Sequence, residues 1–305
     1  MGLIFSGKGI ESDMTVATIQ TLGVIGVGLI GGSFAQCLRQ ANLVQKVLGY
    51  GRDPNSIAKA KELNIIDEIA TLEQIATQAD VIIIATPVKA FPVILQALVP
   101  HLSDKAILSD VGSTKAEVIQ WAYDILGERI AQFVPAHPIA GSHASGPTAA
   151  FPELFQEKNV IITPLKENPS ASVELMKGLW QACGAHVQLL EQAKDHDDIF
   201  AAVSHFPHFL AASYMSFMES DPVRRQALNM GGTGFRDFTR IAAGSPEMWR
   251  DIFMSNRDAM LSQMREFEQE IAHIRTLLEQ KEADKIYEWL ARAAQARRAW
   301  KTVQS

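Results

Sequence analysis

Short apolar runs alternate with amphipathic stretches along the first part of the chain, up to Leu190. Apolar runs of this length, separated by helical patterns, are typical of buried parallel strands joined by helices. The runs cover residues 22–27, 47–50, 81–85, 106–108, 133–136, 160–163 and 187–190. The pattern predicts an α/β fold of the Rossmann type with a doubly wound sheet.

Beyond Leu190 the strand signals cease and the apolar spacing becomes helical. Residues 199–218 are apolar on nearly every face, which predicts a buried helix, bent at Pro207 and capped by the carboxylates within 195–198. A second stripe alternates spacings of four and three and comprises Met260, Met264, Phe267, Ile271, Ile274 and Leu278. Such a seam fits either the core of one subunit or a dimer interface, and we favour the dimer.

The composition is that of a soluble globular protein, because the 305 residues are 47% hydrophobic and 20% charged, enough for about two domains. The net charge of -6 and the lack of a basic stripe argue against a nucleic-acid partner. No apolar run approaches the roughly 20 residues of a membrane span, and residues 1–19 lack a signal-peptide core. Cys37 and Cys183 have no metal or redox spacing, so we expect reduced core thiols and a cytoplasmic location.

The first apolar run leads into a Gly-x-Gly-x-x-Gly sequence, which is followed by a helix-like stretch and a second strand. In this context the three glycines predict a dinucleotide site: one for the tight turn, one for close approach of the pyrophosphate and one for helix packing. The expected cofactor contacts are Gly26, Gly28, Leu29, Ile30, Gly31, Thr86 and Pro87.

The end of the second strand bears on which dinucleotide binds. An acidic residue there would accept from the ribose 2'-hydroxyl, but the chain reads Tyr50-Gly51-Arg52-Asp53. Arginine suits a 2'-phosphate, so we favour NADP over NAD. In the alternative, Arg52 stacks on adenine and Asp53 reaches the ribose of NAD.

Two residues next to strand-like runs are suited to catalysis. His137 lies in a tight loop bounded by Pro138 and Gly141, where a histidine can take a hydroxyl proton at neutral pH. Ser113 follows another strand and can point at a nicotinamide, because ligands sit beyond the carboxyl ends of such strands. The alternative role of Ser113 is the N-cap of the next helix. Together with the dinucleotide site, these residues suggest a dehydrogenase.

Two pairs of basic side chains follow in the helical part. His205 and His208 lie three apart on one helical face, with no zincin glutamate or nearby cysteine. We therefore expect contact with an anionic substrate and no metal. Arg236 and Arg240 lie four apart, which suits capture of a carboxylate, although salt bridges to neighbouring acidic residues are the alternative.

Taken in order, these motifs resemble those of the prephenate and arogenate dehydrogenase family. The resemblance rests on residues 26–33, 110–115, 137–141, 204–208, 234–240 and 248–251. It implies oxidative decarboxylation of a cyclohexadienol with hydride transfer to NAD or NADP, in a cleft between a Rossmann domain and an all-helical dimerisation domain. A hydroxyacid or imine-reducing dehydrogenase and a non-catalytic dinucleotide sensor are the alternatives, and neither accounts for all of these motifs.

The resemblance also implies roles for single residues. His137 accepts the proton, Ser113 bonds the same hydroxyl, and Arg240 pairs with a substrate carboxylate. His208, Ser204 and His205 shape the pocket, Arg236 gates the cleft, and His143 stands where many relatives carry an acid that faces the substrate side chain. This last departure leaves prephenate and arogenate open as substrates.

We therefore expect three segments along the chain. Residues 1–19 form a loose leader, 20–190 the dinucleotide-binding Rossmann domain, and 191–305 an all-α domain that binds the substrate and forms a homodimer.

Overall fold

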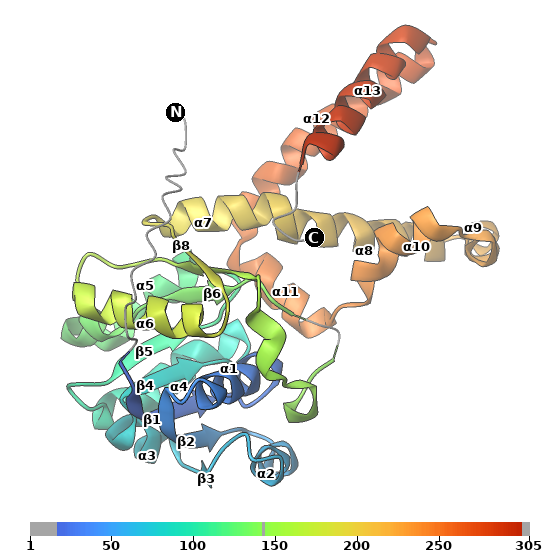
Figure 1. Ribbon diagram of the computed structural model, residues 1–305. Coiled ribbons are helices and arrows are strands. Elements are labelled where there is room, and N and C mark those ends of the chain that lie inside the picture. Colours follow the sequence, from blue (N-terminus) through green and yellow to red (C-terminus); the bar gives the residue numbers. More distant parts are fainter. Residues whose placement is uncertain (1–16, 142–143, 301–305) are drawn as a thin grey trace.

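The computed structural model describes residues 17–141 and 144–300. Within these residues the N-terminal part contains a five-stranded parallel sheet of order β3-β2-β1-β4-β5 (Figure 1). Its strands are β1 (Ile19–Ile25), β2 (Val44–Tyr50), β3 (Glu68–Ile69), β4 (Val81–Ile84) and β5 (Ile107–Asp110). The helices are α1 (Leu29–Gln40), α2 (Pro54–Glu62), α3 (Leu72–Gln78), α4 (Phe91–Leu98) and α5 (Ala116–Leu126). The strand order reverses at β1, and ligands of such sheets bind beyond the carboxyl ends of the strands at this point.

A smaller sheet follows, with the order β6-β7-β8. Its elements are β6 (Ala136–Pro138), β7 (Asn159–Ile162), α6 (Ser170–Ala182) and β8 (His186–Leu189). Because β6 runs antiparallel to β7, the expectation that all seven apolar runs are parallel strands of one sheet is wrong. An apolar run records burial, whereas the connecting loops decide strand direction. The sequence pattern also missed β3, because both of its residues are exposed.

The core has two halves, one on each face of the larger sheet. Leu22 and Val24 of β1 pack into one half, where Phe34 of α1 lies 4.3 Å from Trp180 of α6 between ring centroids. Ile25 packs into the other half with side chains of α3, α4 and α5. Since both faces are covered, the strands read as continuous apolar runs, which confirms the predicted Rossmann-type fold.

The C-terminal part is helical, as the change of period predicts. It contains α7 (Ala193–Phe200), a π-helical segment η6 (Ala201–His205), α8 (Phe206–Glu219), α9 (Pro222–Ala227), α10 (Thr233–Thr239), η8 (Arg240–Ala243), α11 (Pro246–Ser255), α12 (Arg257–Glu279) and α13 (Ala283–Ala299). The long helix predicted around Pro207 is interrupted by η6 just before the proline, whose missing N–H cannot continue the normal ladder. None of the helices within the described ranges has the length and apolarity that a membrane crossing needs.

The predicted burial of residues 199–218 is wrong for a single chain. In α8 the buried residues are Phe206 and Ala211, whereas Tyr214 and Phe217 are exposed. Helices α12 and α13 form a hairpin that projects away from the sheets (Figure 1). The last strand ends at Leu189 and α7 begins at Ala193, on either side of the predicted domain boundary, which stays a prediction. Most of the predicted leader, residues 1–16, lies outside the described residues.

Candidate active site

The glycine turn between β1 and α1 has the geometry of a dinucleotide cradle. Gly26 has a φ of 94°, and a Cβ added there or at Gly31 would collide with backbone. A Cβ at Gly28 would meet nothing within 4 Å, and Gly28 leaves the N-terminus of α1 without a side-chain cap. Thr86 lies against Gly26, and its buried hydroxyl has no hydrogen-bond partner among the described residues. Open space, an uncapped helix N-terminus and an unsatisfied hydroxyl fit a bound pyrophosphate and nicotinamide.

The segment after β2 assigns Asp53 a structural task. Asp53 is the N-cap of α2, and its carboxylate accepts from the backbone N–H groups of Asn55 at 3.2 Å and Ser56 at 3.0 Å. Arg52 is exposed beside it. The carboxylate of Asp53 thus already accepts two hydrogen bonds within the chain, and contact with a ribose would use its remaining lone pairs.

His137 lies inside strand β6, where it pairs with Ile161 of β7, so the prediction that it lies in a loop after the strand is wrong. Its exposed fraction is 7%. Its Nδ1 is 2.9 Å from Nε2 of His196, and its ring packs edge-on against Phe200. Burial, followed by the effects of His196 and Lys115, lowers the pKa of His137 well below 6.5. The ring is therefore neutral at pH 7, as a general base must be.

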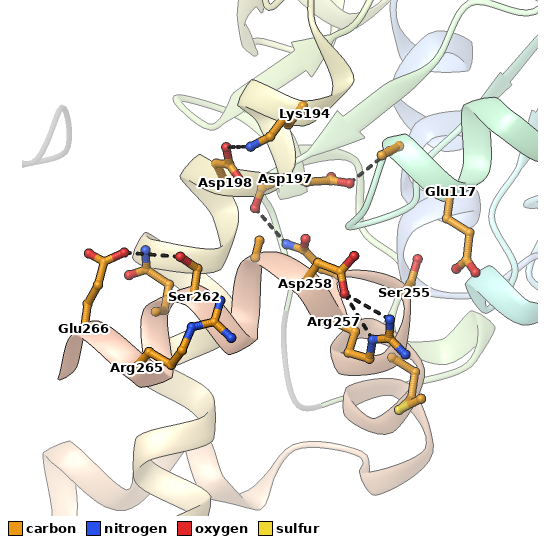
Figure 2. Close-up of a pocket in the computed structure, with 15 residues that line it drawn as sticks. Glu117, Lys194, Asp197, Asp198, Ser255, Arg257, Asp258, Ser262, Arg265 and Glu266 are labelled. Atoms are coloured by element: carbon orange, nitrogen blue, oxygen red, sulfur yellow. Dashed lines mark hydrogen bonds and ion pairs between the residues drawn. The ribbon is translucent and has the colours of Figure 1, made fainter. Parts of the chain in front are cut away.

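The contact to His196 continues into a buried network. Nδ1 of His196 is 2.8 Å from Oδ1 of Asp197, whose carboxylate accepts from the backbone N–H groups of Lys115 at 2.7 Å and Ala116 at 2.9 Å. Asp197 thus caps the N-terminus of α5 instead of the helix that contains it, which corrects the capping role expected from sequence. Figure 2 shows Asp197 with dashed lines to two neighbouring segments.

A buried ion pair supports the same region from the nucleotide-binding side. Lys115 Nζ pairs with Asp110, and the other carboxylate oxygen of Asp110 accepts from the backbone N–H of Ala136 at 3.1 Å, directly before His137. This pair ties the loop after β5 to β6. Sequence reasoning placed Asp110 and Lys115 in a motif without assigning them a task.

Ser113 and His205 lie next to this network. Ser113 is half-buried between β5 and α5. The alternative role predicted for Ser113 was the N-cap of α5, but the side chain that accepts from the first N–H groups of this helix is that of Asp197. His205 Nδ1 is 3.1 Å from Nδ2 of Asn256, which also donates to the backbone carbonyl of Asp197 at 2.7 Å. Burial lowers the pKa of His205 to about 4, against the opposing effects of Asp197 and the Ser113 backbone. Its Nε2 is buried without a hydrogen-bond partner in the described part of the chain, and its role in a substrate pocket stays a prediction.

The remaining predicted residues lie farther along the helical part. Nδ1 of His208 donates to the carbonyl of Ser204 at 2.9 Å, and its ring stacks on Trp249 with centroids 3.7 Å apart. Arg236 in α10 and Arg240 at the start of η8 are both exposed, so their roles stay predictions. The predicted residue His143 lies outside the described residues.

A separate pocket of about 870 Å³ lies between the start of α5, α7, α11 and α12 (Figure 2). Its lining mixes both charges, including Lys194, Asp198 and Arg257. Asp197 lines it, but none of the predicted catalytic or substrate residues does. Residues 17–141 and 144–300 contain no group of three or more histidine, cysteine or acidic side chains that could hold a metal ion.

Comparison with known protein families agrees with this architecture. Residues 34–189 match the model described as prephenate dehydrogenase, nucleotide-binding domain, and residues 192–292 match prephenate dehydrogenase, dimerization domain. A prephenate dehydrogenase of Bacillus subtilis is 36% identical over 276 residues, which are 90% of this chain and 74% of the relative.

Solved structures give the same result. The structure of prephenate dehydrogenase from A. aeolicus with hydroxyphenyl propionate and NAD+ has a TM-score of 0.86 and 33% identity, covering 92% of this chain and 98% of the other. The arogenate dehydrogenase of Synechocystis has a TM-score of 0.78 and 27% identity, covering 91% of this chain and 99% of the other.

Proposed function

The chain belongs to the prephenate dehydrogenase family, and from this membership we propose that it oxidatively decarboxylates prephenate or arogenate in tyrosine biosynthesis. The observation that carries the proposal is His137, a buried and neutral imidazole that directly follows Ala136, whose backbone N–H donates to Asp110 at the carboxyl end of β5. No observation of this structure favours a hydroxyacid dehydrogenase or a non-catalytic sensor.

The reaction needs a proton acceptor, a hydride acceptor and a substrate held in the correct orientation between them. His137 takes the proton of the ring hydroxyl while the electron pair of the adjacent C–H bond leaves as hydride. The ring carboxylate departs as carbon dioxide, the electrons of the broken C–C bond make the ring aromatic as a phenolate, and the proton returns from His137 to that oxygen. The dinucleotide, when bound at the glycine turn, supplies the hydride acceptor. Ser113 orients the same hydroxyl from the loop after β5.

For the substrate, we infer that Arg240 pairs with a carboxylate and that His205, His208 and Ser204 shape the pocket. Arginine binds carboxylates through paired, charge-assisted hydrogen bonds. Arg236 is proposed as the gate of the cleft. Prephenate and arogenate differ in the side chain, a keto acid in one and an amino acid in the other, so their relative rates give the specificity directly.

For the cofactor, we favour NADP. Gly51 removes the carboxylate that would repel a 2'-phosphate, Arg52 is exposed beside that position, and Asp53 is occupied as the cap of α2. The cofactor contacts proposed at the turn are Gly26, Gly28, Leu29, Ile30, Gly31, Thr86 and Pro87.

We propose a homodimer that forms through the helical part, in the cytoplasm. The match to a dimerization domain supports dimer formation. Apolar side chains of the helical part that are exposed in a single chain support an interface at these helices. Phe217 of α8 is 52% exposed, and Ile271 and Leu278 of α12 are 55% and 61% exposed. Burial of such a stripe against a second copy removes apolar surface from water.

The proposal is tested by steady-state rates of the wild-type protein with prephenate and arogenate, each with NAD and NADP. Turnover of at least one substrate, with carbon dioxide and reduced cofactor formed in equal amounts, is the expected result. No turnover in any of the four combinations would refute the proposed activity.

A further inference from the structure

His137, His196 and Asp197 form a buried row that crosses from β6 to α7. The exposed fractions of the three residues are 7%, 0% and 4%, and the two polar contacts between them measure 2.9 Å and 2.8 Å. His196 belongs to none of the sequence motifs that point to catalysis, but it lies between the proposed base His137 and the carboxylate of Asp197.

The protonation states of the three side chains can be derived one after another, starting from Asp197. Asp197 is surrounded by donors, the backbone N–H groups of Lys115 and Ala116, so its carboxylate is an acceptor. Nδ1 of His196 must therefore carry a hydrogen, because two acceptors cannot share this contact. Burial lowers the pKa of His196, so the ring is neutral and its Nε2 is bare.

The same rule applies to the next contact. A bare Nε2 on His196 requires a hydrogen on Nδ1 of His137. Since His137 is neutral as well, its remaining nitrogen, Nε2, is the one without a proton. The row thus selects one of the two tautomers of His137, the one whose basic atom lies on the side away from His196.

We propose that His196 and Asp197 are positioning residues that hold His137 in the tautomer with a bare Nε2, so that this atom can take the hydroxyl proton. The inference rests on the proposed function of His137 as the base. Neither residue touches the substrate in this account, because both act through His137. When His137 gains the proton, the carboxylate of Asp197 stabilises the positive charge through the intervening ring of His196.

The row also makes the base depend on the docking of the two parts of the chain. His137 and the α5 N–H groups belong to the nucleotide-binding part, whereas His196 and Asp197 open the helical part. The charged and titratable groups around the row are the Lys115–Asp110 pair and His205, which Asn256 joins to the carbonyl of Asp197. A cleft that opened by shifting α7 would break the contact to His137 and release its tautomer.

The sharpest test uses a matched pair of variants at one position. In His196→Gln the amide lies about where Nε2 of the histidine lay, so its oxygen can still accept from His137. In His196→Asn the amide lies about where Nδ1 lay, so it keeps the contact to Asp197 and loses the contact to His137. Both replacements are polar and uncharged, so they place similar demands on the buried site.

We expect His196→Asn to lower kcat roughly 10²- to 10⁴-fold, the range seen when a catalytic histidine loses its base function or its tautomer. KM and the dissociation constant of the cofactor should not change, because neither ligand touches His196. His196→Gln should restore a large part of kcat. Asp197→Asn should lower kcat as well, whereas Asp198→Asn, whose carboxylate forms an exposed ion pair with Lys194, serves as the matched control with normal kcat.

The outcomes separate the proposal from a packing role. Thermal melting and cofactor titration identify the folded fraction of each variant, and kcat is expressed for that fraction. Equal kcat in folded His196→Asn and wild type would overturn the inference, as would equal losses in the Asn and Gln variants. A wild-type protein that turns over neither prephenate nor arogenate would instead overturn the proposed function, and the inference with it.

Discussion

The replacement His137→Asn tests the proposed base with little disturbance of the fold. The asparagine amide lies about where Nδ1 of the histidine lay, so the contact with Nε2 of His196, 2.9 Å in the wild type, is kept. No atom remains at the place of Nε2. The variant therefore removes the proton acceptor and leaves the buried network connected.

The expected loss follows from the chemistry of the missing atom. A lost general base costs about 10²- to 10⁴-fold in rate, or roughly 3 to 5 kcal/mol of activation free energy. The smaller side chain also leaves space beside Phe200, whose ring centroid lies 4.7 Å from that of His137. Partial loss of this packing should lower the free energy of unfolding by about 1 to 2 kcal/mol, which leaves the protein folded at 25 °C.

The assay is the initial rate of reduced cofactor formation with prephenate and with arogenate, combined with thermal melting and cofactor titration. In the wild type, kcat should be constant near pH 7 and fall on acidification, because burial holds the pKa of His137 well below 6.5 and protonation removes the base. In His137→Asn this acid limb should vanish from the residual rate. A folded variant with near-normal kcat and an unchanged pH profile would refute the assignment of His137.

Three further predictions concern the cofactor, the substrate and the pH dependence of stability. Arg52→Ala should lower kcat/KM with NADP by roughly 10- to 100-fold and leave kcat/KM with NAD unchanged. Asp53→Ala should lower the free energy of unfolding by about 1 kcal/mol, because the cap of α2 is lost, and leave kcat/KM with both cofactors unchanged. Equal losses with NAD and NADP in Arg52→Ala would mean that the arginine stacks on adenine. Arg240→Ala should weaken the Michaelis complex by roughly 2 to 4 kcal/mol, measured through KM, at unchanged cofactor affinity; a lower Tm at unchanged KM would indicate a structural role instead. The pKa of His205 is about 4 in the folded protein and about 6.5 when unfolded, so the unfolded chain binds more protons between these values and Tm should fall as the pH drops from 6.5 to 4. His205→Gln should reduce this fall, and an identical pH dependence in the variant would contradict the contribution of His205.

Much of the nucleotide-binding part was predictable because its signals are local. Strands buried on both faces appear as continuous apolar runs, and the turn after β1 requires glycine at Gly26, where φ is 94°. The change to helical spacing after Leu190 is equally local. The family resemblance also follows from the sequence, because its motifs are contiguous stretches whose order can be read directly.

The direction of β6 and the exposure of α8 depend on information that periodicity lacks. A run of apolar residues records that a segment is buried, and it is silent on whether its neighbour runs parallel or belongs to another chain. Tyr214 and Phe217 therefore looked like core residues although one chain leaves them exposed. The partner surface that an apolar face needs is a property of the assembled fold.

Local patterns in the amino-acid sequence are enough to predict the Rossmann-type fold, the helical second part, the glycine turn and His137 as the candidate base. Two contacts become visible only in the folded chain: Asp197 caps α5, and His196 contacts His137. These contacts join residues 82 and 59 positions apart in the chain. Sequence patterns encode burial and backbone conformation over a few residues, whereas a hydrogen bond at this separation exists only once the docking of α7 against α5 and β6 has brought both partners to one place.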